Sequence, residues 1–160
     1  MSKSVKPIPD GFHTLTVYLA LPDAAQAIDF YKRAFGAVER YRLPGPSGTG
    51  IAHAEIQIGN TIVMLADESP MGLAKSPMAL GGNTAGLCLY VKGVDAAFSQ
   101  ALKAGATVRR PVEDQFYGER TGTVTDPWGY HWSLMTHIED VSPEEMAKRM
   151  KAMFANASSE

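Results

Sequence analysis

Two ionisable side chains, His53 and Glu55, lie two positions apart in a segment of alternating polar and apolar residues. Side chains two apart on a β-strand point to the same face of the sheet, so these two share a face. An imidazole beside a carboxylate is typical of general acid–base catalysis or of partial metal coordination, and a glutamate in an apolar cavity has a raised pKa. The alternative is a hydrogen-bonded structural pair in which Arg120 neutralises Glu55. His131 is the third candidate for either chemistry.

The alternation around this pair predicts which face each strand turns toward a helix. In segment 51–58, Ala52, Ala54, Ile56 and Ile58 occupy one face, and His53, Glu55 and Gln57 the other. The same rule places Leu15, Val17, Leu19, Val63, Leu65, Leu87, Leu89, Val91, Trp132 and Leu134 beneath helices. It places Thr14, Thr16, Tyr18, Ile62, Met64, Cys88, Tyr90, His131, Ser133 and Met135 on the concave side. We expect the concave set to line one small-molecule cavity.

The elements that position these residues occur twice along the chain. Each half has a strand, a helix that ends at Gly36 or Gly105, and three further strands. Asp126-Pro127-Trp128-Gly129 forms the turn before the last strand. The predicted organisation is a first βαβββ module at 13–66, a linker loop at 67–84, a second βαβββ module at 85–137 and a C-terminal helix at 142–156. This is an α+β fold of two modules.

Composition limits the function classes. The 160 residues are 45% hydrophobic with a net charge of −2, which gives no reason to expect nucleic-acid or membrane binding. Cys88 is the only cysteine, so an internal disulfide is excluded and a reducing, cytoplasmic location is expected. Although its strand position is on the concave side, we expect Cys88 to behave as a small buried hydrophobe. The first residues contain no apolar core of signal-peptide length, and no apolar run reaches the ~18 residues of a membrane span.

Three stretches carry a resemblance to a known family. They are Asp-x-x-x-Ala-Ile-Asp-Phe-Tyr-x-x-x-Phe-Gly-Ala at 23–37, Asp-Gln-Phe-Tyr-Gly-Glu-Arg at 114–120 and Asp-Pro-Trp-Gly-Tyr-His-Trp at 126–132. Over about residues 13–140 the chain resembles the vicinal oxygen chelate superfamily, which includes glyoxalase I, dioxygenases and bleomycin-binding proteins, and within it the PhnB-like branch. The resemblance implies curved sheets that enclose a cavity. It also implies a homodimer, with the cavity built either within one chain or across two subunits.

The resemblance also implies where a metal would bind. The superfamily's ligand positions fall on Thr16, Met64, Gly86 and Ser133, and none of these supplies the imidazole nitrogen or carboxylate oxygen that a divalent metal needs. We therefore predict no metal site and no cofactor. The first hypothesis is a protein that binds a small organic ligand. The alternatives are a lyase or isomerase that uses His53, Glu55 and His131, with or without a metal, and a regulatory module that binds a partner through its C-terminal helix.

The candidate ligand-binding residues combine the concave positions with two residues near the 118–136 hairpin. Tyr117 and Arg120 are candidates for an anionic or aromatic ligand, and a surface ion pair is the equally plausible interpretation of Arg120. The full set is Thr16, Tyr18, His53, Glu55, Met64, Cys88, Tyr90, Tyr117, Arg120, His131 and Ser133.

Overall fold

The fold consists of two four-stranded sheets that share one strand plan. In the computed structural model, which describes residues 5–157, sheet 1 has the strand order β1-β4-β3-β2 and sheet 2 the order β5-β8-β7-β6. Sheet 1 comprises β1 (Val17–Leu21), β2 (Val38–Pro44), β3 (Ile51–Ile58) and β4 (Thr61–Asp67). Sheet 2 comprises β5 (Leu87–Tyr90), β6 (Thr107–Asp114), β7 (Glu119–Thr125) and β8 (His131–His137). The first and last strand of each module pair in parallel, and the predicted α+β fold of two modules is confirmed.

Helix α1 (Ala24–Phe35) covers sheet 1, and helix α3 (Val94–Ala104) covers sheet 2. The Asp23 side chain accepts a hydrogen bond from the Gln26 amide at 3.0 Å and so caps α1, as Asp, Asn and Ser side chains commonly do. Gly36 ends α1 in the left-handed region at φ 65°, which a residue without a Cβ adopts most readily. Phe30 and Tyr31 lie fully buried on the inner face of α1.

Strand alternation sets the helix-covered faces. Ala54, Ile56 and Ile58 are at most 5% exposed, as the period of two predicts. Trp132 and Leu134 are buried in the same way on sheet 2. Ala52 is exposed instead, where the β2–β3 pairing shifts register between Leu43 and Pro44.

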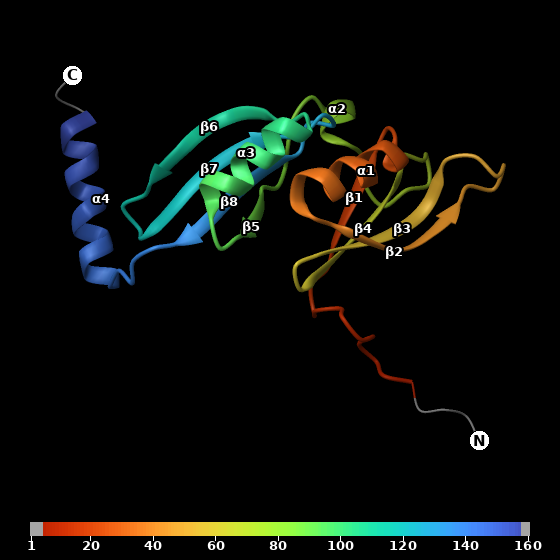
Figure 1. Ribbon diagram of the computed structural model, residues 1–160, viewed down its shortest axis with the longest axis horizontal. Coiled ribbons are helices and arrows are strands. Elements are labelled where there is room, and N and C mark those ends of the chain that lie inside the picture. The colour runs from red at the N-terminus through yellow and green to blue at the C-terminus, as the bar shows by residue number, and fades with distance from the viewer. Residues whose placement is uncertain (1–4, 158–160) are drawn as a thin grey trace.

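The two modules meet through their helices, as Figure 1 shows with α1 and α3 side by side at the centre of the molecule. Buried polar contacts add to this junction. Asp126 Oδ2 accepts hydrogen bonds from the Tyr31 hydroxyl at 2.8 Å and from Trp132 Nε1 at 3.0 Å. The Tyr130 hydroxyl donates to the Ala20 carbonyl at 2.9 Å. The turn of the second module is therefore bonded directly to α1 and β1 of the first.

Three predictions about the first strands and the concave face were wrong. The first strand begins at Val17 rather than Thr14, so Leu15 and Thr16 precede it, and Leu15 is 84% exposed. Cys88, expected to be a small buried hydrophobe, is exposed on the short edge strand β5. Ile62, expected to line the cavity, is buried because the lead-in segment at Gly11 lies against its side chain.

Two helices lie outside the modules. The linker contains a single turn, α2 (Pro77–Leu80), and the chain ends in α4 (Pro143–Ala157), close to the predicted span. Helix α4 extends away from the end of sheet 2 in Figure 1. The Ser142 hydroxyl caps it by accepting from the Glu145 amide at 3.2 Å. No helix within residues 5–157 is long and apolar enough to span a membrane.

Candidate functional site

A line of polar side chains crosses the face of sheet 1 that α1 does not cover. The Tyr18 hydroxyl lies 3.3 Å from His53 Nδ1, and His53 Nε2 lies 3.8 Å from Glu55 Oε1. Met64 on β4 lies between Tyr18 and Glu55, because it pairs with Tyr18 of β1 on one side and with Glu55 of β3 on the other. Tyr41 on β2 flanks the imidazole with a ring separation of 6.2 Å. We call Tyr18, His53 and Glu55 the Tyr18 line.

The Tyr18 line is partly shielded from solvent. The side chains of His53 and Glu55 are 26% and 21% exposed, so each can still contact a bound molecule. Burial raises the pKa of Tyr18, which keeps the phenol protonated near neutral pH. The phenol can then donate to the imidazole, and the carboxylate is left to accept from a ligand or to orient the imidazole. Chemically, this arrangement can bind a polar group or move a proton.

A cavity of about 430 Å³ adjoins Tyr18. Tyr18 and Ala20 of the edge strand β1 and Ala66 of its neighbour β4 line it, and Ile51 and Ala52 border it on β3. The linker supplies the opposite wall: Ser69, Met71, Gly72, Leu73 and Ala74. The volume lies in the range of small-molecule sites, which are about 300–1,000 Å³.

The structure does not bring His131 into this group within one chain. His131 lies on sheet 2, where its Nδ1 is 3.2 Å from the Thr125 hydroxyl, and it borders a different cavity together with Arg109 and Asn83. Burial, with a contribution from Arg109, lowers the pKa of His131 and favours the neutral imidazole. Ser133 is bonded to Thr123 at 3.1 Å on the same sheet.

Arg120 forms ion pairs on sheet 2 and does not reach Glu55. Its guanidinium pairs with Asp95 of α3 at 2.8 Å and with Asp114 at 2.7 Å, so it belongs to the helix-covered side of sheet 2. The interpretation in which Arg120 neutralises Glu55 is therefore wrong, and the surface ion pair is the arrangement found. Tyr117 lies in the β6–β7 turn, with its ring 5.2 Å from that of Phe116.

The residues at the superfamily's metal positions do not suit a divalent metal. Thr16 precedes β1 and its hydroxyl donates to the His13 carbonyl, Met64 offers a thioether, Gly86 has no side chain, and Ser133 is hydrogen-bonded to Thr123. Within residues 5–157, no group of three His, Cys, Asp or Glu side chains is placed to hold a metal ion. No mechanistic step through a metal follows from this donor set.

Sequence reasoning missed part of this site. Tyr41 escaped attention because the alternation of β2 is weak and nearly all of its residues are exposed. The linker wall could not be derived from a local pattern, because only the tertiary fold brings residues 69–74 and Tyr18 to the same cavity. The two Pro and three Gly of segment 67–84 marked it as irregular and nothing more.

The fold and the sequence together identify the family. The chain belongs to the glyoxalase/bleomycin resistance protein/dioxygenase superfamily, whose family model matches residues 12–134. The predicted resemblance is thereby confirmed. The chain is 45% identical over 141 residues to the uncharacterized protein Mb0911c of Mycobacterium bovis, covering 86% of this chain and 92% of the relative. It is equally similar to Rv0887c of Mycobacterium tuberculosis, of which 82% is covered.

Solved structures share the architecture. TioX from Micromonospora sp. ML1 superposes with a TM-score of 0.63 at 31% identity, over 79% of this chain and 99% of TioX. A PhnB protein from Bacillus cereus superposes with a TM-score of 0.60 at 16% identity, over 78% of this chain and 99% of that one. At this low identity, the second likeness concerns the fold alone.

Proposed function

We propose that the chain binds a small organic molecule against the uncovered face of sheet 1, without a metal. The observation that supports this most directly is the Tyr18 line, a half-buried row of donors and acceptors whose first member, Tyr18, lines a cavity of about 430 Å³. Apolar walls with a few polar groups are typical of ligand sites. The unsuitable donor set at the superfamily's metal positions supports the metal-free form of the proposal.

The test is to identify what copurifies with the protein and then to change the Tyr18 line. We expect native mass spectrometry to detect a bound compound, and we expect His53→Ala and Glu55→Gln to weaken its binding at least tenfold while the urea midpoint stays nearly unchanged. Gln57→Ala, on the same strand and face, is the matched control and should bind normally. Unchanged affinity in both site variants would remove the basis for the proposal. So would about one equivalent of a divalent metal per chain by elemental analysis.

A second candidate is a lyase or isomerase. The separation of 3.8 Å between His53 Nε2 and Glu55 Oε1 favours it, since a carboxylate that orients an imidazole is a common acid–base arrangement. His131 lies on the other sheet, so it could join His53 and Glu55 only from a second chain. Turnover by the purified protein that disappears in Glu55→Gln, while the ligand still binds, would favour this candidate over simple binding.

The binding unit that we propose is a cytoplasmic homodimer. Helices α1 and α3 pack against each other within one chain, and each sheet keeps one face without a helix. Pairing sheet 1 of one copy with sheet 2 of another would cover both of these faces. Light scattering should give twice the chain mass at micromolar concentration, and a monomer at that concentration would contradict this part of the proposal.

A further inference from the structure

The cavity that His131 borders is built by the linker and sheet 2 of the same chain. Its volume is about 610 Å³. Pro77 and Met78 of α2 give it an apolar wall, and Arg109, Thr125 and His131 line it from β6, β7 and β8. Thr125 and His131 are a cross-strand pair, so their side chains lie on the same face of the sheet. The cavity therefore combines an apolar side with a polar side, as small-molecule sites do.

The linker wall of this cavity is held against the turn that precedes β8. The side-chain amide of Asn83 donates to the Gly129 carbonyl at 2.7 Å. Gly129, at φ 91°, lies so close to α2 that a Cβ added there would be 3.2 Å from Pro77 Cβ. Ser76, the buried cap of α2, donates its backbone N–H to Glu68 at 2.7 Å. The cavity is thus formed by the folded chain itself, without the need for a ligand to order the linker.

A β-bulge in β6 contributes Arg109 to the cavity. The cross-strand register shifts between Val108 and Arg110, so Arg109 is the extra residue between two successive pairs. Bulges redirect side chains and are common beside binding sites. The Arg109 guanidinium makes no hydrogen bond or ion pair with the part of the chain that the structure describes, whereas Arg120 is held by two carboxylates. Arg109 is therefore the arginine of sheet 2 that is available to an anionic ligand.

The polar groups of the cavity favour an anion. Among the described residues that line it, none carries a carboxylate. The Thr125 hydroxyl lies 3.2 Å from Nδ1 of His131, which leaves Nε2 to contact a ligand. Burial and then Arg109 lower the pKa of His131, and the charge of Asp126 opposes them. An anion beside the imidazole would offset the effect of Arg109 and favour the protonated form, which donates from both nitrogens.

We propose that this cavity binds the carboxylate group of a small organic acid through Arg109 and His131. A planar carboxylate matches the fixed fork of N–H donors on a guanidinium. Pro77 and Met78 offer apolar contact to the organic part of the ligand, and the volume is in the range of sites for whole organic molecules. The inference rests on the function proposed above, because the proposed dimer would join this face of sheet 2 to the face that carries the Tyr18 line. It adds the chemical class of the ligand.

The test uses the intact protein at neutral pH and physiological ionic strength with three probes. They are benzoate, its neutral isostere benzamide, and inorganic phosphate, and backbone amide shifts report the binding. We expect saturable shifts with benzoate at residues 81–83 and 129–131, binding of benzamide at least tenfold weaker, and weaker binding of phosphate, which has no apolar part. Arg109→Gln should weaken benzoate binding at least tenfold. Arg110→Gln, which removes the same charge from the next position outside the cavity, should change it less than twofold.

His131 provides a second readout at the site itself. Its pKa, measured by NMR titration of the ring protons, should rise when benzoate saturates the protein, because a neighbouring anion stabilises the imidazolium. Equal binding of benzoate and benzamide, phosphate bound as tightly as benzoate, full affinity in Arg109→Gln, or an unchanged pKa of His131 would each overturn the proposal. A copurified compound that has no acidic group but needs His53 and Glu55 would also overturn it, and would leave the function proposed above intact.

Discussion

At the scale of single residues, Asp126 contributes to both the turn and the junction of the modules. One carboxylate oxygen accepts from the amides of Trp128 and Tyr130 at 3.0 and 2.9 Å, and the other accepts from Tyr31 and Trp132. Four donors converge on a side chain that is 3% exposed. Such a group is costly to alter, because any donor left behind stays buried.

Asp126→Asn should therefore destabilise the protein by about 2–3 kcal/mol, since an amide nitrogen cannot accept from the donors that one oxygen now satisfies. Urea unfolding followed by circular dichroism measures the loss. Asp29→Asn, on the exposed side of α1, is the control and should change the free energy of unfolding by less than about 0.5 kcal/mol. Equal stability of the two variants would show that the convergent bonds of Asp126 contribute little.

Glu39 gives the fold a defined dependence on pH. Hydrogen bonds from Arg42 and Lys32 lower the pKa of Glu39 to about 2. A lowered pKa means that the ionised form is favoured in the folded state. Its stabilising contribution is present above the ordinary value of 4.5 and is lost as the pH falls toward 2.

Glu39→Gln should accordingly cost about 1 kcal/mol at pH 7 and less at pH 3. The estimate is kept small because both cationic partners are partly solvated. Urea midpoints of wild type and variant at the two pH values test it, with Glu144→Gln as a charge-matched control. A difference between wild type and Glu39→Gln that stays the same at both pH values would contradict the assignment.

Single residues also show which features of the fold could be predicted from the sequence. Alternation placed Ala54, Ile56 and Trp132 correctly, because burial beneath a helix follows strand parity. It could not decide between the interpretations of Arg120, because a strand pattern contains no information about charges such as Asp95 on a neighbouring helix. Cys88 was misplaced for a related reason: an apolar strand at the edge of a sheet has the same local pattern as a central one.

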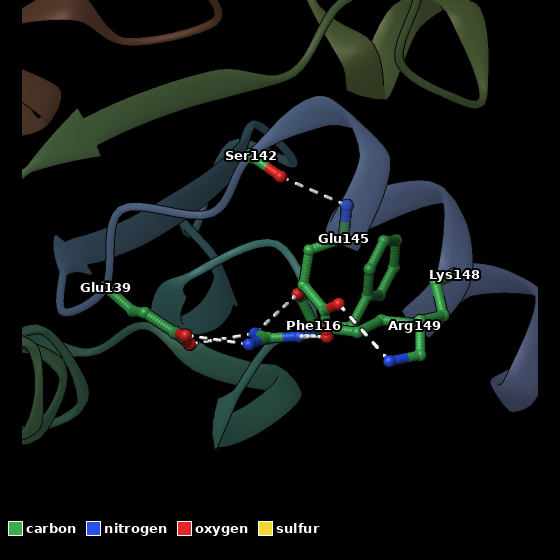
Figure 2. Close-up of polar contacts among 6 residues, drawn as sticks. All are labelled: Phe116, Glu139, Ser142, Glu145, Lys148 and Arg149. Carbon is green, nitrogen blue, oxygen red and sulfur yellow. Dashed lines mark hydrogen bonds and ion pairs between the residues drawn. The ribbon is translucent and has the colours of Figure 1, made fainter.

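At the scale of elements, the Arg149 guanidinium links α4 to its own module. Arg149 contacts Glu139 at 2.7 Å, Glu145 at 3.1 Å and the Phe116 carbonyl at 3.3 Å, as Figure 2 shows. Its neighbour Lys148 lies 3.6 Å from Glu145 on the same helix. These contacts join α4 to the β6–β7 turn and to the segment that follows β8.

Arg149→Met should release the first turns of α4 while leaving both sheets intact. The methionine preserves much of the apolar stem, so the loss falls on the polar contacts. Hydrogen exchange of the amides at 145–153 should become several times faster, and exchange in β7 and β8 should not change. Lys151→Met, an exposed position on the same helix, is the control. Unchanged exchange in Arg149→Met would show that other contacts hold the helix.

At the scale of the whole molecule, sequence patterns predicted two modules but did not determine which of the helix-free sheet faces pack against each other. Local alternation specifies the face of each sheet and says nothing of whether the opposing sheet comes from the same chain. His53 lies between Tyr18 and Glu55, at 3.3 and 3.8 Å from them, whereas His131 and Ser133 bond to residues of sheet 2. The packing of α1 on α3 separates these two groups within one chain.

A mixed dimer distinguishes a cavity within one chain from one built across two. If sheet 1 of one copy faces sheet 2 of the other, then pairing a His53→Ala chain with a His131→Ala chain puts both changes in one cavity and leaves the second cavity unaltered. Each homodimer of a single variant should bind the copurified compound weakly, and the mixed dimer should bind half the wild-type amount with wild-type affinity. If instead each chain forms its own cavity, His131 lies outside that cavity, so the His131→Ala homodimer should bind the compound with wild-type affinity. Differently tagged chains, coexpressed and purified through both tags, make the comparison by native mass spectrometry. If the mixed dimer does not bind half the wild-type amount of compound with wild-type affinity, the arrangement across subunits is ruled out, because that geometry necessarily leaves one cavity intact.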